Sequence, residues 1–304
     1  MPISNYNRFP QGVNIGGFNV LNTYAGNVFW VDSGTGADGN KGTHRQPLAT
    51  VDNAIGKCTA NNGDIIVLFP GHSETVATSI AADVAGISII GLGAGSDMAS
   101  LMGPKTDACI DVSAANITIK GVKFLAQTGT TQAATQQINV AAAYCTIEDC
   151  VFLNGVYDDD SVYVMVTGDY LAVRNCEWWV TANGPDTAIY LDGADNSDTL
   201  TGVLIENSYF NGGSVTNAWD NGTIYSSGVH TQCRLKSNIF AHVASGVGAI
   251  EFIAAATGTI ADNYFGNGTI AQMLDPGSCM CFGNLQADAV DETGSALPPT
   301  GATT

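Results

Sequence analysis

Apolar and polar residues alternate in short runs along the chain, and one eight-residue run recurs. It begins with two apolar residues separated by one position, continues with Gly, Asp, Asn or Ser and a small residue, and ends on an aromatic ring. The clearest copies cover 117–124, 145–152, 171–178, 203–210, 233–240 and 258–265, and weaker copies begin at Ile87 and Cys279. A period of two predicts β-strands, and a repeat every 25 to 32 residues predicts units that stack on their neighbours.

A second alternating run lies a few residues upstream of most copies, for example at 109–112, 162–166, 188–191 and 249–253. Each unit therefore holds two or three short strands. No helical periodicity separates them, as a strand–helix repeat would require. We expect an all-β fold in which each unit is one coil of a parallel β-helix.

Stacked coils place equivalent positions in columns. The third residue of each copy is expected to point inward, giving the column Ile119, Ile147, Val173, Ile205, Leu235 and Ile260. The final ring gives a second column, Phe124, Phe152, Trp178, Phe210, Phe240 and Phe265. The turn position holds residues that tolerate left-handed backbone, Asp149, Asn175, Asn207 and Asp262. A ladder of small residues follows it: Cys150, Cys176, Ser208, Asn238 and Asn263.

The periodicity divides the chain into four parts. Residues 1–27 have none and are expected to form an extended arm. In the initial segment 28–75, an amphipathic helix is expected over 47–60, where it would cap the open first coil. The coils are expected over 76–288, and a flexible tail over 289–304.

Composition narrows the function. Only 12% of residues are charged, and 28 acidic against 10 basic residues give a net charge of −18. So few basic residues exclude nucleic acid and anionic membranes as partners. The start of the chain, Met1–Tyr6, has neither a basic nor an apolar region, so we expect no secretory signal. The eight cysteines lack the spacing of zinc ligands and are expected to be buried free thiols.

Three carboxylates are candidates for chemistry. Asp160, Asp186 and Asp220 each precede the first strand of successive coils, which would stack them about 4.8 Å apart. Carboxylates so close could recruit a cation, with Ca²⁺ the candidate, or act as an acid and a base. They could equally be ordinary turn residues, and we assign no catalytic residue, metal ligand or cofactor.

Other candidates are isolated features. Asp32, Asp38 and Asn40 lie in a Gly-rich loop that suits either a cation or simple Asx turns. Trp179 should point outward if Trp178 points inward, and Trp219 is expected to be exposed in a loop. Both tryptophans could stack on sugar rings or on a second subunit. The glycines 91, 93 and 95 predict a turn rather than a dinucleotide loop. Arg174 and Arg234 lie on repeat strands outside any cluster.

The segment 27–75 carries a resemblance to a known family. Its motifs are Trp30–Gly34, Asn40–Thr43, Gln46–Thr50, Gly63–Val67 and Pro70–Gly71. They resemble the first segment of pectin-lyase-like right-handed β-helix proteins. The variant with Asn27–Asp32 resembles virion proteins of tailed bacteriophages. The resemblance implies a right-handed parallel β-helix.

The resemblance also implies a function. We expect a non-enzymatic phage structural protein, a homotrimer that decorates or cements the capsid and attaches to capsid or other virion proteins through residues 1–27. The homotrimer is favoured because 12% charge covers the faces of a monomer poorly. The alternative is a tail spike that binds or cleaves host surface polysaccharide, and a secreted carbohydrate enzyme is a third possibility. The expected location is the virion, and host glycans are a possible further partner.

Overall fold

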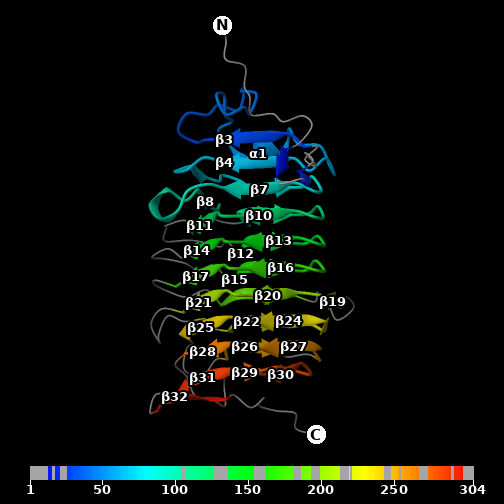
Figure 1. Cartoon of the computed structure of the whole chain (residues 1–304), viewed down its shortest axis with the longest axis vertical. Helices are drawn as coiled ribbons and strands as arrows, with labels where there is room; N and C mark the ends of the chain where they lie inside the picture. Colours follow the sequence, from blue (N-terminus) through cyan, green and yellow to red (C-terminus); the bar gives the residue numbers. More distant parts are fainter. Residues whose placement is uncertain are drawn as a thin grey trace.

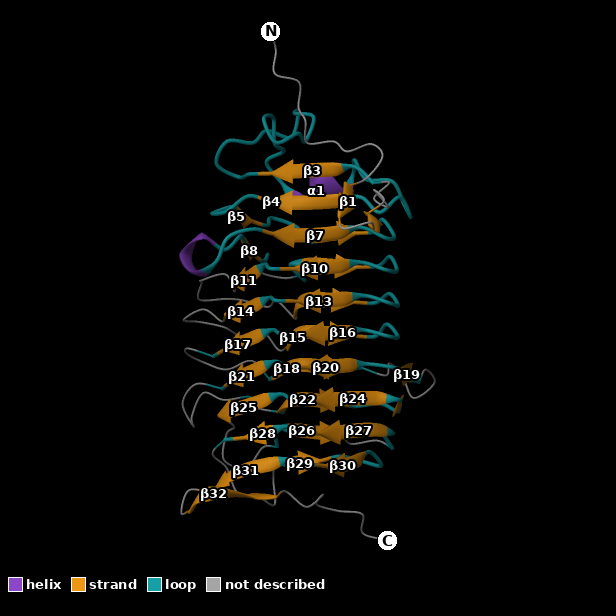
Figure 2. Ribbon diagram, in the orientation of Figure 1, coloured by secondary structure: helices purple, strands orange, loops and turns teal. Residues whose placement is uncertain are grey.

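The computed structural model describes residues 13–15, 18–20, 26–104, 107–125, 136–153, 162–180, 186–192, 199–212, 219, 221–242, 248–252, 255–266, 273–288 and 291–296. Within these residues the fold is a right-handed parallel β-helix, as the sequence predicts (Figure 1). Three long sheets run along the helix axis, and each complete coil, from the one that begins at Ile65 to the one that begins at Gly258, contributes one strand to each sheet (Figure 2).

The first sheet has ten strands, all parallel. They are β3 (Val28–Val31), β4 (Ile65–Leu68), β7 (Ser88–Gly91), β10 (Thr118–Lys120), β13 (Thr146–Glu148), β16 (Ala172–Arg174), β20 (Leu204–Glu206), β24 (Cys233–Lys236), β27 (Gly258–Ala261) and β30 (Met280–Phe282).

The second sheet also has ten strands. They are β5 (Ser73–Thr75), β8 (Ser100–Met102), β11 (Lys123–Leu125), β14 (Val151–Leu153), β17 (Glu177–Trp179), β21 (Tyr209–Asn211), β25 (Ile239–His242), β28 (Tyr264–Phe265), β31 (Leu285–Asp288) and β32 (Asp291–Ala296).

The third sheet has eight strands. They are β6 (Ile80–Ala82), β9 (Ile110–Val112), β12 (Gln136–Val140), β15 (Val162–Val166), β18 (Thr187–Leu191), β22 (Gly222–Ser226), β26 (Ile250–Phe252) and β29 (Leu274–Asp275). A two-stranded parallel pair, β19 (Leu200–Thr201) and β23 (His230–Thr231), lies at one turn. A short 3₁₀ helix, η1 (Gly95–Asp97), follows the predicted glycine turn.

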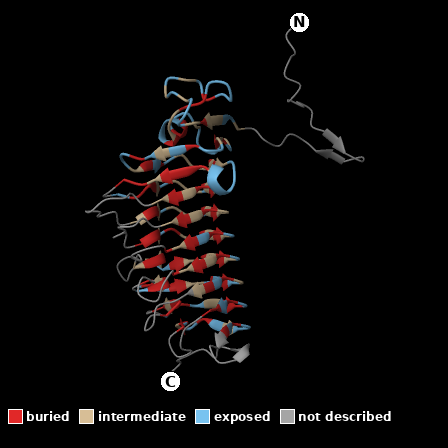
Figure 3. Ribbon diagram, turned by 90° about the vertical axis from the view of Figure 1, so that its left-hand side faces the viewer, coloured by how far each residue is buried: buried red, intermediate tan, exposed pale blue. Residues whose placement is uncertain are grey.

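The register confirms both predicted inward columns. Ile119 pairs with Ile147, and the column continues unbroken to Ile260. The aromatic rings stack in parallel, with centroids 4.4 Å apart between Trp178 and Phe210 and 5.1 Å apart between Phe124 and Phe152. Buried residues fill the interior of the coils along the axis (Figure 3). The core is therefore a stack of equivalent layers.

The turn column and the small-residue ladder are also confirmed. Asp149, Asn175, Asn207 and Asp262 all have φ between 52° and 55°, the left-handed region that Asn and Asp tolerate. Beside them, Asn238 and Asn263 are buried, and Asn284 extends the ladder by one coil. Each amide donates to a carbonyl one coil earlier, with Asn238 Nδ2 2.9 Å from Ile205 O and Asn263 Nδ2 3.1 Å from Leu235 O. The side-chain oxygens accept from backbone N–H groups of the coil before, Ser208 N for Asn238 at 3.1 Å, so the ladder bonds successive coils to one another.

The capping helix is much shorter than predicted. Helix α1 covers only Val51–Ile55, because Thr50 caps its N-terminus and the chain turns at Gly56. The preceding residues are extended, since Leu48 N donates to Trp30 O at 2.8 Å and Leu48 forms a parallel bridge with Val31. Val51, Ala54 and Ile55 are buried, so the helix covers the first coil as expected.

Both ends of the chain hold strands that the sequence pattern does not predict. Within the expected arm, β1 (Val13–Ile15) and β2 (Phe18–Val20) form an antiparallel hairpin. Within the expected flexible tail 289–304, β32 pairs antiparallel with β31, so residues 291–296 are part of the second sheet. An antiparallel partner on the last coil covers an edge that would otherwise stay open.

The eight cysteines are free thiols and six of them are buried, as predicted. Burial raises the pKa of the Cys233 and Cys279 thiols to about 12, which keeps them protonated and unreactive. No helix among the described residues is long and apolar enough to cross a membrane.

Candidate functional site

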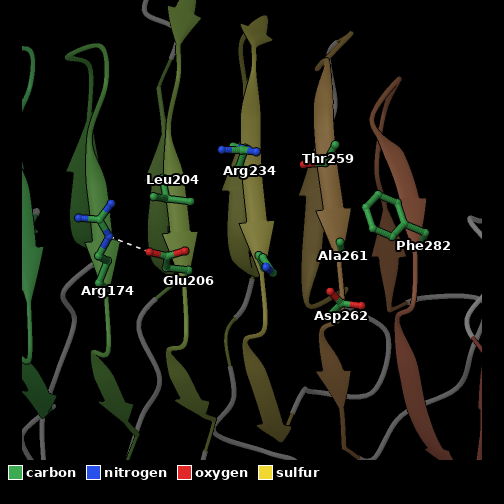
Figure 4. Close-up of a pocket in the computed structure, with 9 residues that line it drawn as sticks. Arg174, Leu204, Glu206, Arg234, Thr259, Ala261, Asp262 and Phe282 are labelled. Atoms are coloured by element: carbon green, nitrogen blue, oxygen red, sulfur yellow. Dashed lines mark hydrogen bonds and ion pairs between the residues drawn. The ribbon is translucent and has the colours of Figure 1, made fainter.

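A groove of about 450 Å³ lies on the outer face of the first sheet, across its last coils (Figure 4). It is lined by side chains from five neighbouring strands and the turn after β27: Arg174, Leu204, Glu206, Arg234, Lys236, Thr259, Ala261, Asp262 and Phe282. Residues as far apart in the sequence as Arg174 and Phe282 cannot form a local motif, so only the coil repeat brings them together.

Strand register sets the order of these side chains. One outward row runs through Arg174, Glu206, Lys236, Ala261 and Phe282, which are partners in successive strands. A parallel outward row runs through Leu204, Arg234 and Thr259. Neighbouring members of a row are about 4.8 Å apart, the spacing of strands in a sheet. The groove is therefore a straight track along the helix axis.

The charged groups of the groove are only partly paired. Arg174 Nε donates to Glu206 Oε1 at 2.7 Å, which holds the carboxylate in place across one coil step (Figure 4). Arg234 and Lys236 are both exposed on β24, and neither forms an ion pair with any residue in the described part of the chain. Two cations on adjacent outward positions are thus available to an anionic ligand.

The groove also differs in charge from the rest of the protein. Three of the 10 basic residues line it, against two acidic residues, Glu206 and Asp262. The chain as a whole carries −18. Because unlike charges raise the local concentration of a ligand, this local excess of cations favours an anionic ligand here over other parts of the surface.

The far end of the groove holds the small side chain of Ala261, the ring of Phe282 and the carboxylate of Asp262. Ala261 is buried between Lys236 and Phe282, and its short side chain leaves a depression there. Phe282 is 52% exposed. Asp262 lies against Gly283, where a Cβ would be 2.4 Å from its Oδ1, so only glycine leaves room for the carboxylate in this position.

The predicted column of aspartates stays a prediction. Asp160 and Asp220 lie outside the described residues. Asp186 is half-buried, and its backbone carbonyl accepts a hydrogen bond from Asn221 N at 2.8 Å. In the described part of the chain, no three His, Cys, Asp or Glu side chains are grouped as metal ligands.

The two candidate aromatic residues have different outcomes. Trp219, predicted to be exposed, is instead fully buried and packs edge-on against Tyr163 with ring centroids 5.8 Å apart. The prediction was wrong because the ring of a loop residue can fold back over the apolar interior. Trp179 is half-buried on the outer face of the second sheet, beside Tyr209 at 5.2 Å, and its Nε1 donates to Glu177 Oε2 at 3.1 Å.

In the Gly-rich loop of the initial segment, the side chains of Asp32 and Asp38 accept hydrogen bonds from backbone N–H groups. Asp32 Oδ1 accepts from Gly34 N at 2.9 Å, and the hydroxyl hydrogen bond from Thr35 lowers the pKa of the Asp32 carboxyl. Asp38 Oδ1 accepts from Ala49 N and Thr50 N at 3.1 and 3.0 Å. Asp32 therefore forms the Asx turn that was one of the two expectations, whereas Asp38 ties the loop to the residues just before helix α1.

The groove residues were missed at the level of sequence, where Arg174 and Arg234 are placed outside any cluster. A usable signal was present. Arg234 and Lys236 are two positions apart on a predicted strand, so they share one face. Arg174 and Glu206 occupy the same position of successive repeat copies, so they had to be neighbours.

Comparisons with solved structures show which known proteins share this fold. No protein-family model and no curated protein matches the chain. A solved rhamnogalacturonan lyase is similar with a TM-score of 0.56 and 15% identity over 79% of this chain and 68% of that one. A pectate lyase has a TM-score of 0.53 and 14% identity over 91% and 82%. A PL6 family alginate lyase has a TM-score of 0.56 and 14% identity over 77% of this chain and 33% of its own.

These similarities define the chain as a parallel β-helix protein with the pectate-lyase-like fold. They also correct the expectation of a non-enzymatic protein, because the structures that share the fold are polysaccharide-degrading enzymes. That expectation came from the resemblance to virion proteins and in part from placing Arg174 and Arg234 outside any cluster. The coil repeat instead gathers three basic residues in one groove.

Proposed function

We propose that this protein binds and cleaves an acidic polysaccharide in the groove on the first sheet. The observation that carries the proposal is the pair of exposed cations on β24, which have no ion-pair partner in the described part of the chain and lie in a straight groove. The names of the similar structures, lyases of rhamnogalacturonan, pectate and alginate, support a polysaccharide as the substrate.

The binding step follows from the geometry of the groove. The guanidinium of Arg234 can hold a sugar carboxylate through two parallel hydrogen bonds, and the Lys236 ammonium adds a second positive charge beside it. A strand spacing of about 4.8 Å is close to the length of one sugar unit, so successive sugars lie over successive coils. The polysaccharide chain then runs along the helix axis.

The cleavage step that suits such a site is an elimination. A base removes the proton from the carbon beside the sugar carboxylate, that electron pair forms a carbon–carbon double bond, and the glycosidic oxygen leaves and takes up a proton. A cation on the carboxylate stabilises the negative charge that develops on it. Glu206, Lys236 and Asp262 are the groove residues able to accept or donate these protons.

The test is a product assay on polygalacturonate, alginate and rhamnogalacturonan, with dextran as the neutral control. We expect the ultraviolet absorbance of an unsaturated sugar to rise with at least one acidic polymer. The double variant Arg234→Gln/Lys236→Gln should lose this activity, while Lys57→Gln, at an exposed cation beside the capping helix, should keep it. Reducing ends without unsaturated product would indicate hydrolysis, and no cleavage of any acidic polymer would refute the proposal.

We further propose that this activity belongs to a tail spike that binds or cleaves host surface polysaccharide. The resemblance of residues 27–75 to virion proteins of tailed bacteriophages supports this context. Residues 1–27 would attach the protein to other virion proteins. Mass spectrometry of purified phage particles tests the location, and the absence of the chain from them would contradict it.

A further inference from the structure

The end of the groove at Phe282 exposes apolar side chains, which cannot pair with the carboxylate of an acidic sugar. Phe282 and Met280 are 52% and 66% exposed on β30, the last strand of the first sheet. A half-exposed phenylalanine on a strand gains little from burial, so the fold itself does not require an aromatic ring at this position. Phe282 nonetheless lines the same groove as the cations.

Strand register fixes the distance between the cations on β24 and the exposed ring of Phe282 on β30. Lys236 pairs with Ala261 and Ala261 pairs with Phe282, so the ring lies two strand spacings, about 10 Å, from the lysine along one row. Ala261 ends at Cβ and leaves the depression between them (Figure 4). A ligand that follows the row thus meets a cation, a shallow dip and an aromatic ring in that order.

We propose that Phe282 forms an apolar subsite for a methyl group carried by a sugar about two units from the one whose carboxylate binds at Arg234 and Lys236. This inference rests on the proposed function and specifies the substrate as a mixed polymer of acidic and methyl-bearing sugars. The methyl group can belong to an acetyl ester or to a 6-deoxy sugar. Either one packs against the ring and removes apolar surface from water.

The test compares three immobilised polymers on a biosensor: polygalacturonate, the same polymer after chemical O-acetylation, and deacylated gellan, whose repeat carries a 6-deoxyhexose two units from a uronate. We expect the wild-type protein to bind at least one methyl-bearing polymer about tenfold more tightly than plain polygalacturonate, consistent with one aromatic contact. The polymer that binds more tightly than polygalacturonate identifies the source of the methyl group.

Variants separate this subsite from the cation site. Phe282→Ala should remove the tenfold preference and leave the affinity for plain polygalacturonate unchanged. Tyr264→Ala is the matched control, since Tyr264 is 43% exposed but lies on the second sheet. Lys236→Gln should weaken binding of all three polymers.

Three results would overturn the inference. Equal affinity of the wild-type protein for all three polymers would refute the methyl subsite and leave the proposed function standing. If Phe282→Ala changes the molecular mass of the protein in solution but not the preference, then the ring contacts another copy of the chain instead. Failure to bind any of the three polymers would refute the proposed function as well.

Discussion

The buried asparagine ladder should contribute a large share of the stability, and Asn238→Ala tests this. Asn238 Oδ1 accepts from Ser208 N at 3.1 Å, and its Nδ2 donates to Ile205 O at 2.9 Å and to Asn263 Oδ1 at 3.0 Å. Alanine leaves the two backbone groups without these partners in the interior. Each unsatisfied buried group costs about 1–3 kcal/mol, so the free energy of unfolding should fall by about 2–5 kcal/mol.

Urea denaturation followed by circular dichroism measures this change. The matched variant is Ser208→Asn, which extends the ladder by one rung, because Ser208 is buried and its Oγ already lies 3.3 Å from Cys176 N. We expect Ser208→Asn to change stability by less than about 1 kcal/mol. A loss below about 1 kcal/mol for Asn238→Ala would refute the reasoning, since the ladder would then be replaceable by water.

Three further predictions concern pH, backbone and assembly. Burial lowers the pKa of His230 to about 4, so the unfolded chain, with an ordinary pKa near 6.5, takes up a proton that the folded chain does not. The free energy of unfolding should therefore fall by up to about 3 kcal/mol as the pH drops from 6.5 to 4. In pH-dependent unfolding, this loss should be absent from His230→Gln and present in His44→Gln. Gly258→Ala should abolish soluble expression or lower the melting temperature sharply, because its Cβ would lie 2.0 Å from Cys233 O at a φ of +149°. A melting temperature unchanged by the substitution would contradict this close approach. The expected homotrimer predicts a light-scattering mass of three times the 31.4 kDa of one chain, and a stable mass of one chain at micromolar concentration would exclude it.

The repeated features of the fold were predictable because the same sequence pattern recurs in each coil. The columns that contain Ile147 and Trp178, and the left-handed turn at Asn175, follow from a period of two inside a repeat of 25 to 32 residues. Features that occur once were not. The extended segment before the helix exists because Leu48 pairs with β3, and Trp219 is buried by a contact that no periodicity encodes.

The candidate site shows the same division. A column is visible in sequence once the register is known, so the ion pair of Arg174 with Glu206 and the shared face of Arg234 and Lys236 could have been derived from the aligned copies. The groove itself could not, because its depth depends on Ala261 being flanked by longer side chains. From their positions in the sequence, the basic residues therefore appeared scattered. Stacking of the coils brings three of them together in one groove.

The most direct test of the account is a crystal structure with an acidic oligosaccharide bound. We predict that the sugar chain lies along the outer face of the first sheet, with a carboxylate within hydrogen-bonding distance of Arg234 or Lys236 and the chain continuing toward Phe282. An oligosaccharide bound on the second or third sheet, with these two cations still free of ligand, would contradict the account.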